Sequence, residues 1–310
     1  MENEKEIISL VSQKQEIQKR LNNLVYGTME IREKNDKKYI YVHYRDEGIQ
    51  ISKYVGEYSD ELNNLILNNN IIARDLKKKL KEIDKKLNKL GYKDTELDEK
   101  VKLNIDFARK NLVSTIYKQA ILEGVTTTYA DTENIIEGGK VNNMTSEDIQ
   151  KVLNLKHAWD FILNENVITS PTNYSLLCQI NKNILEGFFY NAGIIRSTPV
   201  SIGGTNWKPE YPIEDVVKNE INDIMSGEDG IEKGIQLVLY IMKKQIFIDG
   251  NKRTAIIFAN HYYISHAMGL IAIPEKLTEE FKTLLIDYYE GKDKTKIVEF
   301  LKSKCFISLK

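Results

Sequence analysis

Residues 245–255 read QIFIDGNKRTA, and this stretch decides the fold of the larger part of the chain. It lies between two segments whose apolar residues recur at helical spacing, so we expect a tight loop that leads into a helix. The first N–H groups of a helix have no partner within the helix and carry partial positive charge. Such a helix start accepts phosphate readily, and Gly250 lets the backbone approach an anion closely.

The side chains of this stretch add to the same chemistry. Asn251, Lys252 and Arg253 supply hydrogen-bond donors and positive charge, and Asp249 can hold a divalent cation that bridges phosphate oxygens. Phe247 is expected to pin the loop to the core. An ordinary turn between two helices, followed by basic residues, would have a similar sequence. The other motifs of the chain are therefore needed to distinguish a phosphate-binding loop from such a turn.

The stretch resembles the signature of the Fic/Doc family, His-(Pro/Ile)-Phe-x-(Asp/Glu)-Gly-Asn-(Gly/Lys)-Arg, and matches it over residues 246–253. Other motifs follow in the family's order: residues 193–204 resemble the entry to the target-binding flap, residues 133–138 the inhibitory-helix motif, and residues 285–300 the closing helices. The resemblance covers about residues 98–304. It implies a mainly α, all-helical Fic-type domain with a short β-hairpin flap. Residues 196–212 read as that hairpin or as an extended flap.

The resemblance also implies roles for individual residues. Active members bind a nucleoside triphosphate, usually ATP, and transfer AMP to a hydroxyl side chain of a protein. By resemblance, Asp249 would bind Mg²⁺, and Gly250, Asn251, Lys252 and Arg253 would hold the phosphates. The flap would pair with the backbone of a target protein that presents a Ser, Thr or Tyr hydroxyl. The flap residues are Val200, Ser201, Ile202, Gly203 and Gly204, and the residues that would wall the base are Asn260, Tyr288 and Tyr289. Alternatively, the two adjacent tyrosines are half-buried packing residues of a helix.

Gln245 is the first departure from the family pattern, because the family places its catalytic histidine at this position as the general base. A glutamine amide donates and accepts hydrogen bonds but takes up no proton near neutral pH. Loss of a positioned general base typically costs about 10²–10⁴-fold in rate. None of the four histidines is an obvious substitute, and His261 is more simply explained as a structural residue.

Ile256 is the second departure, because many members carry there an arginine that pairs with the inhibitory glutamate. Glu137, at the end of the predicted inhibitory-type helix near residues 126–138, therefore has no assured partner. It is expected either to pair with Arg253 and close the phosphate site or to be an exposed glutamate at a helix end.

Three functions are compatible with these residues. The first is a Fic-like ATP-binding protein with impaired AMP transfer, acting as a regulatory or binding module. The second is an active transferase with a non-standard base such as Glu137. The third is a non-enzymatic module that acts through its N-terminal part, with the Fic-like domain (residues 93–310) as a scaffold.

Residues 1–92 lie outside the resemblance and predict a helical arm with a small β head. Alternating apolar and polar residues over 28–54, with turns at 35–37 and 46–48, predict a three-stranded meander between two long helices. Ser59 is the expected N-cap of the second helix, whose heptad pattern predicts an antiparallel helix pair. Lysines crowd this helix and indicate a solvated face or, alternatively, a basic patch for an acidic partner or a nucleic acid.

The composition narrows the class of protein. The 44 basic and 45 acidic residues nearly cancel, so we expect no overall attraction of the chain to nucleic acid or to a membrane. The acidic N-terminus differs from a signal peptide, and no apolar run is long enough to span a membrane. Two distant cysteines indicate neither a disulfide scaffold nor a zinc site. We expect a cytoplasmic protein, of open oligomeric state that includes a homodimer.

Overall fold

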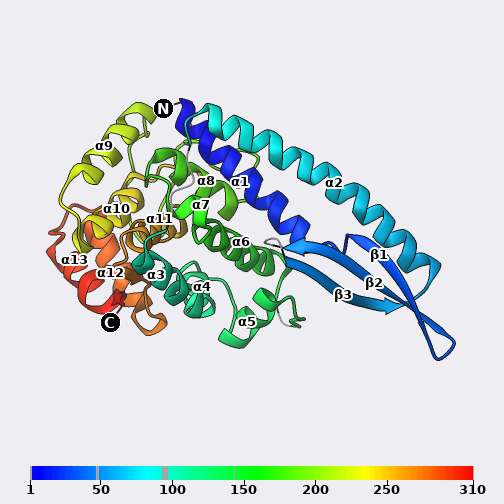
Figure 1. The fold of residues 1–310 in the computed structure, drawn as a ribbon. Helices are drawn as coiled ribbons and strands as arrows, with labels where there is room; N and C mark the ends of the chain where they lie inside the picture. The colour runs from blue at the N-terminus through cyan, green and yellow to red at the C-terminus, as the bar shows by residue number, and fades with distance from the viewer. Residues whose placement is uncertain (1, 47–48, 93–96, 143, 310) are drawn as a thin grey trace. The chain divides into compact units, whose positions relative to one another are not determined.

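The computed structural model describes residues 2–46, 49–92, 97–142 and 144–309 (Figure 1). It forms two compact units: a small unit, Ser9–Lys93, and a large unit, Met1–Ile8 with Asp94–Lys310. The first residues of the chain thus group with the large unit, whereas the sequence placed the whole of residues 1–92 in one arm.

Helix α1 (Glu2–Asn22), from Ser9 onward, and helix α2 (Asp60–Lys89) form the helical part of the small unit. Ser59 caps α2 as predicted, because its side chain accepts a hydrogen bond from the Leu62 N–H. Leu21 of α1 packs on Ala73 and Leu76 of α2. Lys14 pairs with Asp84 at 3.0 Å further along both helices. The antiparallel pairing expected from the heptad pattern is therefore confirmed.

A three-stranded antiparallel meander joins these helices, as predicted: β1 (Thr28–Lys34), β2 (Lys37–Asp46) and β3 (Ile49–Glu57). Ile40 and Val42, two residues apart on β2, are buried together with Ile66 of α2. Asn35 and Asp36 both have positive φ in the first turn, the conformation that a two-residue hairpin requires. Glu47 and Gly48 of the second predicted turn lie outside the described residues.

The junction between α1 and β1 is fixed by side chains of α2. Asn69 donates a hydrogen bond to the Val25 carbonyl, while Asn70 accepts one from the Gly27 N–H and donates one to the Gly27 carbonyl. Gly27 has φ of 144°, and a Cβ there would lie 2.4 Å from the carbonyl oxygen of His43. Only glycine fits this junction without displacing β2.

Helix α11 is the central element of the large unit (Figure 1). It packs against α10, α8, α6, α3 and β4, and almost all of its residues are buried. Gly234 of α10 lets α10 and α11 approach closely, because a Cβ there would meet the Tyr263 ring. The helices of this unit are α3 (Glu99–Lys110), α4 (Leu112–Leu122), α5 (Tyr129–Glu137), α6 (Ser146–Ile162), α7 (Glu165–Ile168), α8 (Tyr174–Ile184), α9 (Glu214–Ser226), α10 (Ile231–Lys244), α11 (Asn251–Ser265), α12 (Thr278–Tyr289) and α13 (Thr295–Phe300).

The mainly helical class is confirmed, with three local differences. The helical spacing of apolar residues over 97–122 predicts one helix, but this segment is divided into α3 and α4 at Asn111, whose side chain donates a hydrogen bond to the Phe107 carbonyl. The flap over 196–212 is an extended loop and not a β-hairpin, because no ladder of hydrogen bonds forms between its described residues. The strands of the large unit are instead β4 (Gly269–Ile271) and β5 (Phe306–Ser308), too short to stand out from the sequence.

Within the described residues, no helix combines the length and the apolar character needed to cross a lipid bilayer.

Replacing Gly27 by alanine should destabilise the small unit by about 2–4 kcal/mol, because the new Cβ overlaps the His43 carbonyl and φ is unfavourable. Hydrogen exchange of the β1 and β2 amides measures this loss. Gly91→Ala is the matched control, since Gly91 also has positive φ but no heavy atom within 4 Å of the added Cβ, and it should cost about 1 kcal/mol. Equal losses in the two variants would show that the contact with β2 is unimportant.

Candidate functional site

The loop at 245–250 is bounded by two residues in left-handed backbone conformation. Gln245 ends α10 with φ of 49° and ψ of 61°, and Gly250 precedes α11 with φ of 74°. Between them, Ile246 and Phe247 are fully buried, so Phe247 pins the loop to the core as the sequence predicted. The chain therefore reverses direction while its apolar residues face inward and Asp249 stays exposed.

Asn251 ties this loop together from the first turn of α11. Its Oδ1 accepts a hydrogen bond from the Phe247 N–H at 3.0 Å, and its Nδ2 donates to the Phe247 carbonyl at 2.8 Å and to Gln245 Oε1 at 3.1 Å. The amide of Asn251 is thus used inside the loop. Only its backbone N–H remains for the phosphate role that the resemblance implies.

Asn181 of α8 holds the other side of the loop. Its Nδ2 donates to the Asp249 carbonyl and to the Thr254 hydroxyl, both at 3.1 Å, and its Oδ1 accepts from the Gly193 N–H at 2.9 Å. A Cβ on Gly250 would lie 3.2 Å from this same amide. Asn181 is fully buried. It therefore connects the loop to the segment that leads into the flap.

The start of α11 has the features of an anion site. No side chain caps it, so its first N–H groups have no such partner. Lys252 and Arg253 lie in the first turn and add positive charge. Asp249 faces them with a half-exposed carboxylate, which accepts a hydrogen bond from Arg253 at 2.8 Å. This arrangement can bind a phosphate group through N–H donors, positive charge and helix polarity together.

Glu123, at the end of α4, occupies the neighbourhood of these cations. Its carboxylate lies 3.4 Å from Lys252 Nζ and 3.5 Å from Arg253 Nε, and its side chain is only 12% exposed. Neither contact has hydrogen-bond geometry, since Glu123 Oε1 and Arg253 Nε have no hydrogen-bond partner among the described residues. An anionic group therefore already lies against the two cations, which shows that they can face one.

Glu137 does not make this contact. It is exposed at the end of α5, and no ion pair or hydrogen bond among the described residues involves its side chain. The expected pairing of Glu137 with Arg253 is wrong, and the alternative of an exposed glutamate at a helix end is correct. Glu123 and Glu137 each precede a glycine in left-handed conformation, Gly124 and Gly138. The Glu-Gly pattern therefore occurs twice in the sequence. The contacts of Glu123 with Lys252 and Arg253 distinguish Glu123 from Glu137.

The amide of Gln245 is occupied at both ends. Its Nε2 donates to the Met242 carbonyl at 2.6 Å, and its Oε1 accepts from Asn251. Burial raises the pKa of the Tyr289 hydroxyl above its ordinary range. Neither the Gln245 amide nor the Tyr289 hydroxyl accepts a proton near neutral pH.

Arg196 links the flap to the loop. The buried guanidinium donates to the carbonyls of Gln245, Thr198 and Glu210, at 2.5, 2.9 and 2.6 Å, and burial lowers the pKa of Arg196. Its backbone N–H donates to the Ile246 carbonyl. One side chain thus holds both ends of the flap against the residue at the family's histidine position.

The flap residues Val200 to Gly204 are mostly exposed, and among the described residues no backbone hydrogen bond is made by them. Their edge remains open for a partner strand, and their role in target binding stays a prediction. Trp207, further along the flap, stacks on Tyr289 with ring centroids 5.2 Å apart. Trp207 had not been singled out from the sequence, because only the tertiary structure brings it to α12.

The three residues predicted to wall a nucleotide base differ in position. Tyr289 is buried beneath Trp207 and next to Gln245, whereas Tyr288 lies under the Lys243 ammonium, 4.6 Å from its ring centroid. Asn260 is fully buried, and its amide bonds the Ile256 carbonyl and both backbone groups of Ile271. Asn260 therefore holds α11 to β4, and its assignment to a base pocket is wrong.

His261 is structural, as the sequence indicated. Its ring nitrogens bond the Thr172 hydroxyl and the Val167 carbonyl, both at 2.9 Å. Complete burial lowers the pKa of His261 to about 4, although the bond to Val167 opposes this shift. The imidazole therefore stays neutral and makes its contacts within the core.

The described residues of this site offer a divalent cation one carboxylate, that of Asp249, so its other ligands would come from a nucleotide. Among the described residues, no cluster of three His, Cys, Asp or Glu side chains could hold a metal ion. Asp249 offers one carboxylate at the edge of the uncapped helix start, and Mg²⁺ is typically held by one or two carboxylates together with substrate phosphates. The donor set fits Mg²⁺ that arrives with a nucleotide.

Comparison with known proteins agrees with this geometry. The model of the Fic/DOC family matches residues 171–263, a range that includes α8, the flap, α10, the loop and most of α11. The search of curated proteins found no match.

Several solved structures share the fold. Fic-1 (residues 134–508) from C. elegans superposes with a TM-score of 0.53 at 18% identity, over 74% of this chain and 72% of that chain. A Fic domain containing signaling protein from Bacteroides thetaiotaomicron VPI-5482 has a TM-score of 0.53 at 17% identity, over 67% and 86%. A Fic family protein from Desulfovibrio desulfuricans G20 has a TM-score of 0.50 at 14% identity, over 67% and 72%.

The buried imidazole of His261 predicts a pH dependence of stability. Because the folded pKa of about 4 lies below the ordinary value of 6.5, the unfolded chain binds the additional proton between these values. Stability should therefore fall as pH drops from 6.5 toward 4, by up to the order of 3 kcal/mol from this residue. NMR titration of the ring and urea unfolding at both pH values measure it. His261→Gln should lose less stability over the same interval, and a His261 pKa near 6.5 would contradict the assignment.

Proposed function

This chain carries a Fic/DOC-family domain, and we propose that it binds ATP with Mg²⁺ at the start of α11 and transfers AMP weakly or not at all. Members of this family are generally nucleotidyl transferases. The observation that carries the proposal is an uncapped helix start with two cations, Lys252 and Arg253, beside an amide at the position of the general base.

The phosphates have defined partners in this proposal. The backbone N–H groups of the first turn of α11, together with Lys252 and Arg253, hold the phosphate oxygens. Asp249 would hold Mg²⁺, which would supply positive charge beside the phosphates. Gly250 keeps the loop close to the ligand, because a side chain there would press on Asn181. The loop is already in this conformation through Asn251, so binding requires little ordering of the backbone.

Glu123 competes with the phosphates for the same cations. Its carboxylate lies within 3.5 Å of both Lys252 and Arg253, and a triphosphate that uses these side chains has to displace it. Since the carboxylate is largely buried, its repulsion of a nearby phosphate is weakly screened. We therefore assign to Glu123, and not to Glu137, the inhibitory role in this chain.

Transfer of AMP to a protein hydroxyl requires removal of a proton from that hydroxyl. Gln245 cannot take it, and its amide is held by Met242 and Asn251. Positioning and electrostatic stabilisation by the loop remain, so residual transfer is expected to be slow and not abolished. The target protein would present its hydroxyl along the open edge of residues 200–204.

Calorimetry with ATP and Mg²⁺ tests the binding site. Glu123→Ala should bind ATP about tenfold more tightly than the wild type, because the competing carboxylate is gone, and tenfold corresponds to about 1.4 kcal/mol. Glu137→Ala removes the same charge from an exposed helix end and should leave the affinity within about twofold. Absence of binding heat for Glu123→Ala at millimolar ATP would end the proposal, and equal gains in both variants would refute the role of Glu123.

The missing general base is tested by restoring it. Gln245→His should increase transfer of labelled AMP to protein bands of a cell lysate by about 10²-fold or more. The effect should be largest together with Glu123→Ala and should disappear in Gln245→His with Arg253→Ala, which loses the phosphate contact. Wild-type labelling as strong as that of Gln245→His would show that the glutamine does not limit the reaction.

A further inference from the structure

The charge of the chain is divided unequally between its two units. The small unit carries 18 Lys and Arg residues against 12 Asp and Glu residues, a formal charge of +6, whereas the remainder carries 26 against 33, a formal charge of −7. The balance of the whole chain therefore conceals a basic unit. A polyanion is attracted to the small unit even though the net charge is close to zero.

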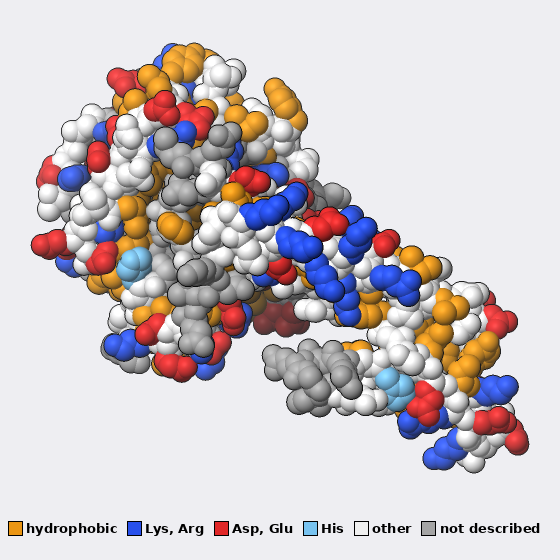
Figure 2. All heavy atoms as spheres, turned by 45° about the horizontal axis from the view of Figure 1, so that its top comes forward, with side chains coloured by type: hydrophobic (Ala, Val, Ile, Leu, Met, Phe, Trp, Pro, Cys, Tyr) orange, Lys and Arg blue, Asp and Glu red, His pale blue; other side chains and the backbone are white. Residues whose placement is uncertain are grey.

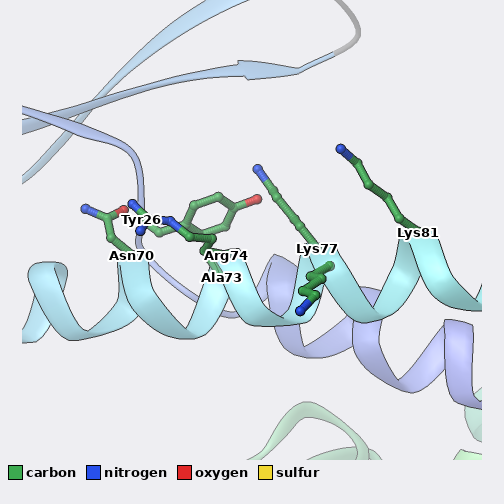
Figure 3. A pocket seen from close by; sticks show the side chains of 7 residues that line it. Tyr26, Asn70, Ala73, Arg74, Lys77 and Lys81 are labelled. Carbon is green, nitrogen blue, oxygen red and sulfur yellow. The ribbon is translucent and has the colours of Figure 1, made fainter.

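A groove on the small unit collects much of this charge. It is a hollow of about 480 Å³ along α2, lined by Arg74, Lys77, Lys78, Lys81 and the ring of Tyr26. Arg74, Lys77 and Lys81 follow one another at intervals of three and four residues, so they share one face of the helix at a rise of about 5 Å each. Figure 3 shows Lys77 and Lys81 extending on the same side of α2 as the Tyr26 ring.

Within the part of the chain that the structure describes, the cations of this groove have no carboxylate partners. Among the described residues, none of the ion pairs involves Arg74, Lys77, Lys78 or Lys81, although Lys14 on the facing helix pairs with Asp84. Figure 2 shows Lys and Arg side chains gathered over α2. A row of unpaired cations repels itself, and an external polyanion relieves that repulsion while releasing its own counterions.

Tyr26 is held in the groove as a fixed aromatic surface. The backbone on both sides of it is tied to α2 by Asn69 and Asn70, and the Lys77 ammonium lies 4.7 Å from the centre of its ring. The ring therefore needs little ordering when a ligand arrives. An aromatic face next to a row of cations suits a nucleotide, whose base stacks while its phosphate pairs.

The groove continues onto the sheet. A second hollow of about 660 Å³ shares Tyr26, Arg74 and Lys77 with the first and extends to His43 and Tyr44 of β2. Beyond it, Glu30 is hydrogen-bonded to both Arg32 and His43, so its charge is matched locally. The path thus offers the Tyr26 ring beside its cations and the Tyr44 ring on the sheet, and it is longer than a single nucleotide.

We propose that this groove binds single-stranded nucleic acid. The cations track the phosphates of one strand, and Tyr26 and Tyr44 offer their ring faces to bases. An acidic peptide would pair with the same cations but would make no use of the two rings. A duplex would keep its bases stacked inside and away from them.

Fluorescence anisotropy of the full chain with a labelled 12-nucleotide poly(dT) or poly(U) tests the proposal. The triple variant Arg74→Gln, Lys77→Gln, Lys81→Gln should lose at least about tenfold in affinity. Its plot of log K against log salt should be shallower by about 2, because three phosphate contacts on a single strand are gone. Tyr26→Leu, which keeps an apolar side chain without a ring, should lose about tenfold with an unchanged salt slope.

The matched control is the triple variant Lys79→Gln, Lys86→Gln, Lys89→Gln, which removes the same charge from exposed positions of α2 that do not line the groove. It should retain affinity within about threefold. Equal losses in both triple variants, or equally tight binding of an abasic strand, would overturn the proposal. Binding of a poly(Glu) peptide without binding of either oligonucleotide would do so as well and would assign the groove to an acidic protein segment.

Discussion

The large unit depends on satisfying the backbone polar groups of a loop that its own apolar residues bury. Ile246 and Phe247 are fully enclosed, and every buried N–H or carbonyl left without a partner would cost on the order of 1–3 kcal/mol. Asn251 supplies the partners from α11, Asn181 from α8 and Arg196 from the base of the flap. Three side chains far apart in the sequence therefore fix one short loop.

This constraint explains why the loop can keep its shape without the family's histidine. The glutamine at position 245 uses its amide to bond Met242 and Asn251, so the side chain contributes to loop closure. Because both ends of this amide are hydrogen-bonded within the protein, they are not free to bond a reacting group. The proposed phosphate site relies on backbone N–H groups and on the side chains of α11, and these are independent of the residue at position 245.

The electrostatics of the site follow from crowding a few charges into a poorly solvated space. Arg253 contacts both Asp249 and Glu123, and Lys252 contacts Glu123 as well. Breaking such a pair without a replacement would leave buried charge uncompensated. A triphosphate bound as proposed would provide that replacement, because it would exchange one anion for another and leave the cations compensated.

The sequence predicted those parts of the molecule that are determined by local pattern. Helical spacing, the Ser59 cap, the meander and the loop at 245–253 all arise from neighbouring residues. What it could not predict depends on distant contacts. Glu123 and Glu137 have the same local setting before a left-handed glycine, and only the packing of α4 against the loop separates them. Asn260 likewise reads as a ligand-facing residue until β4 is placed against it.

The net charge of the whole chain hides a local difference for a related reason. The net charge adds up all charges as if they acted at one place. Salt screens charges beyond about 8–10 Å, so a polyanion at the surface responds mainly to the charges near it.

The helix start of α11 and the groove of α2 are both suited to anions, but by different means. The first uses fixed N–H groups and charges that are already compensated by Glu123, which favours a compact, highly charged ligand able to displace a carboxylate. The second uses unpaired lysine side chains beside a ring, which favours an extended polyanion and demands no displacement. The two sites should therefore differ in salt sensitivity, with the groove far more dependent on it.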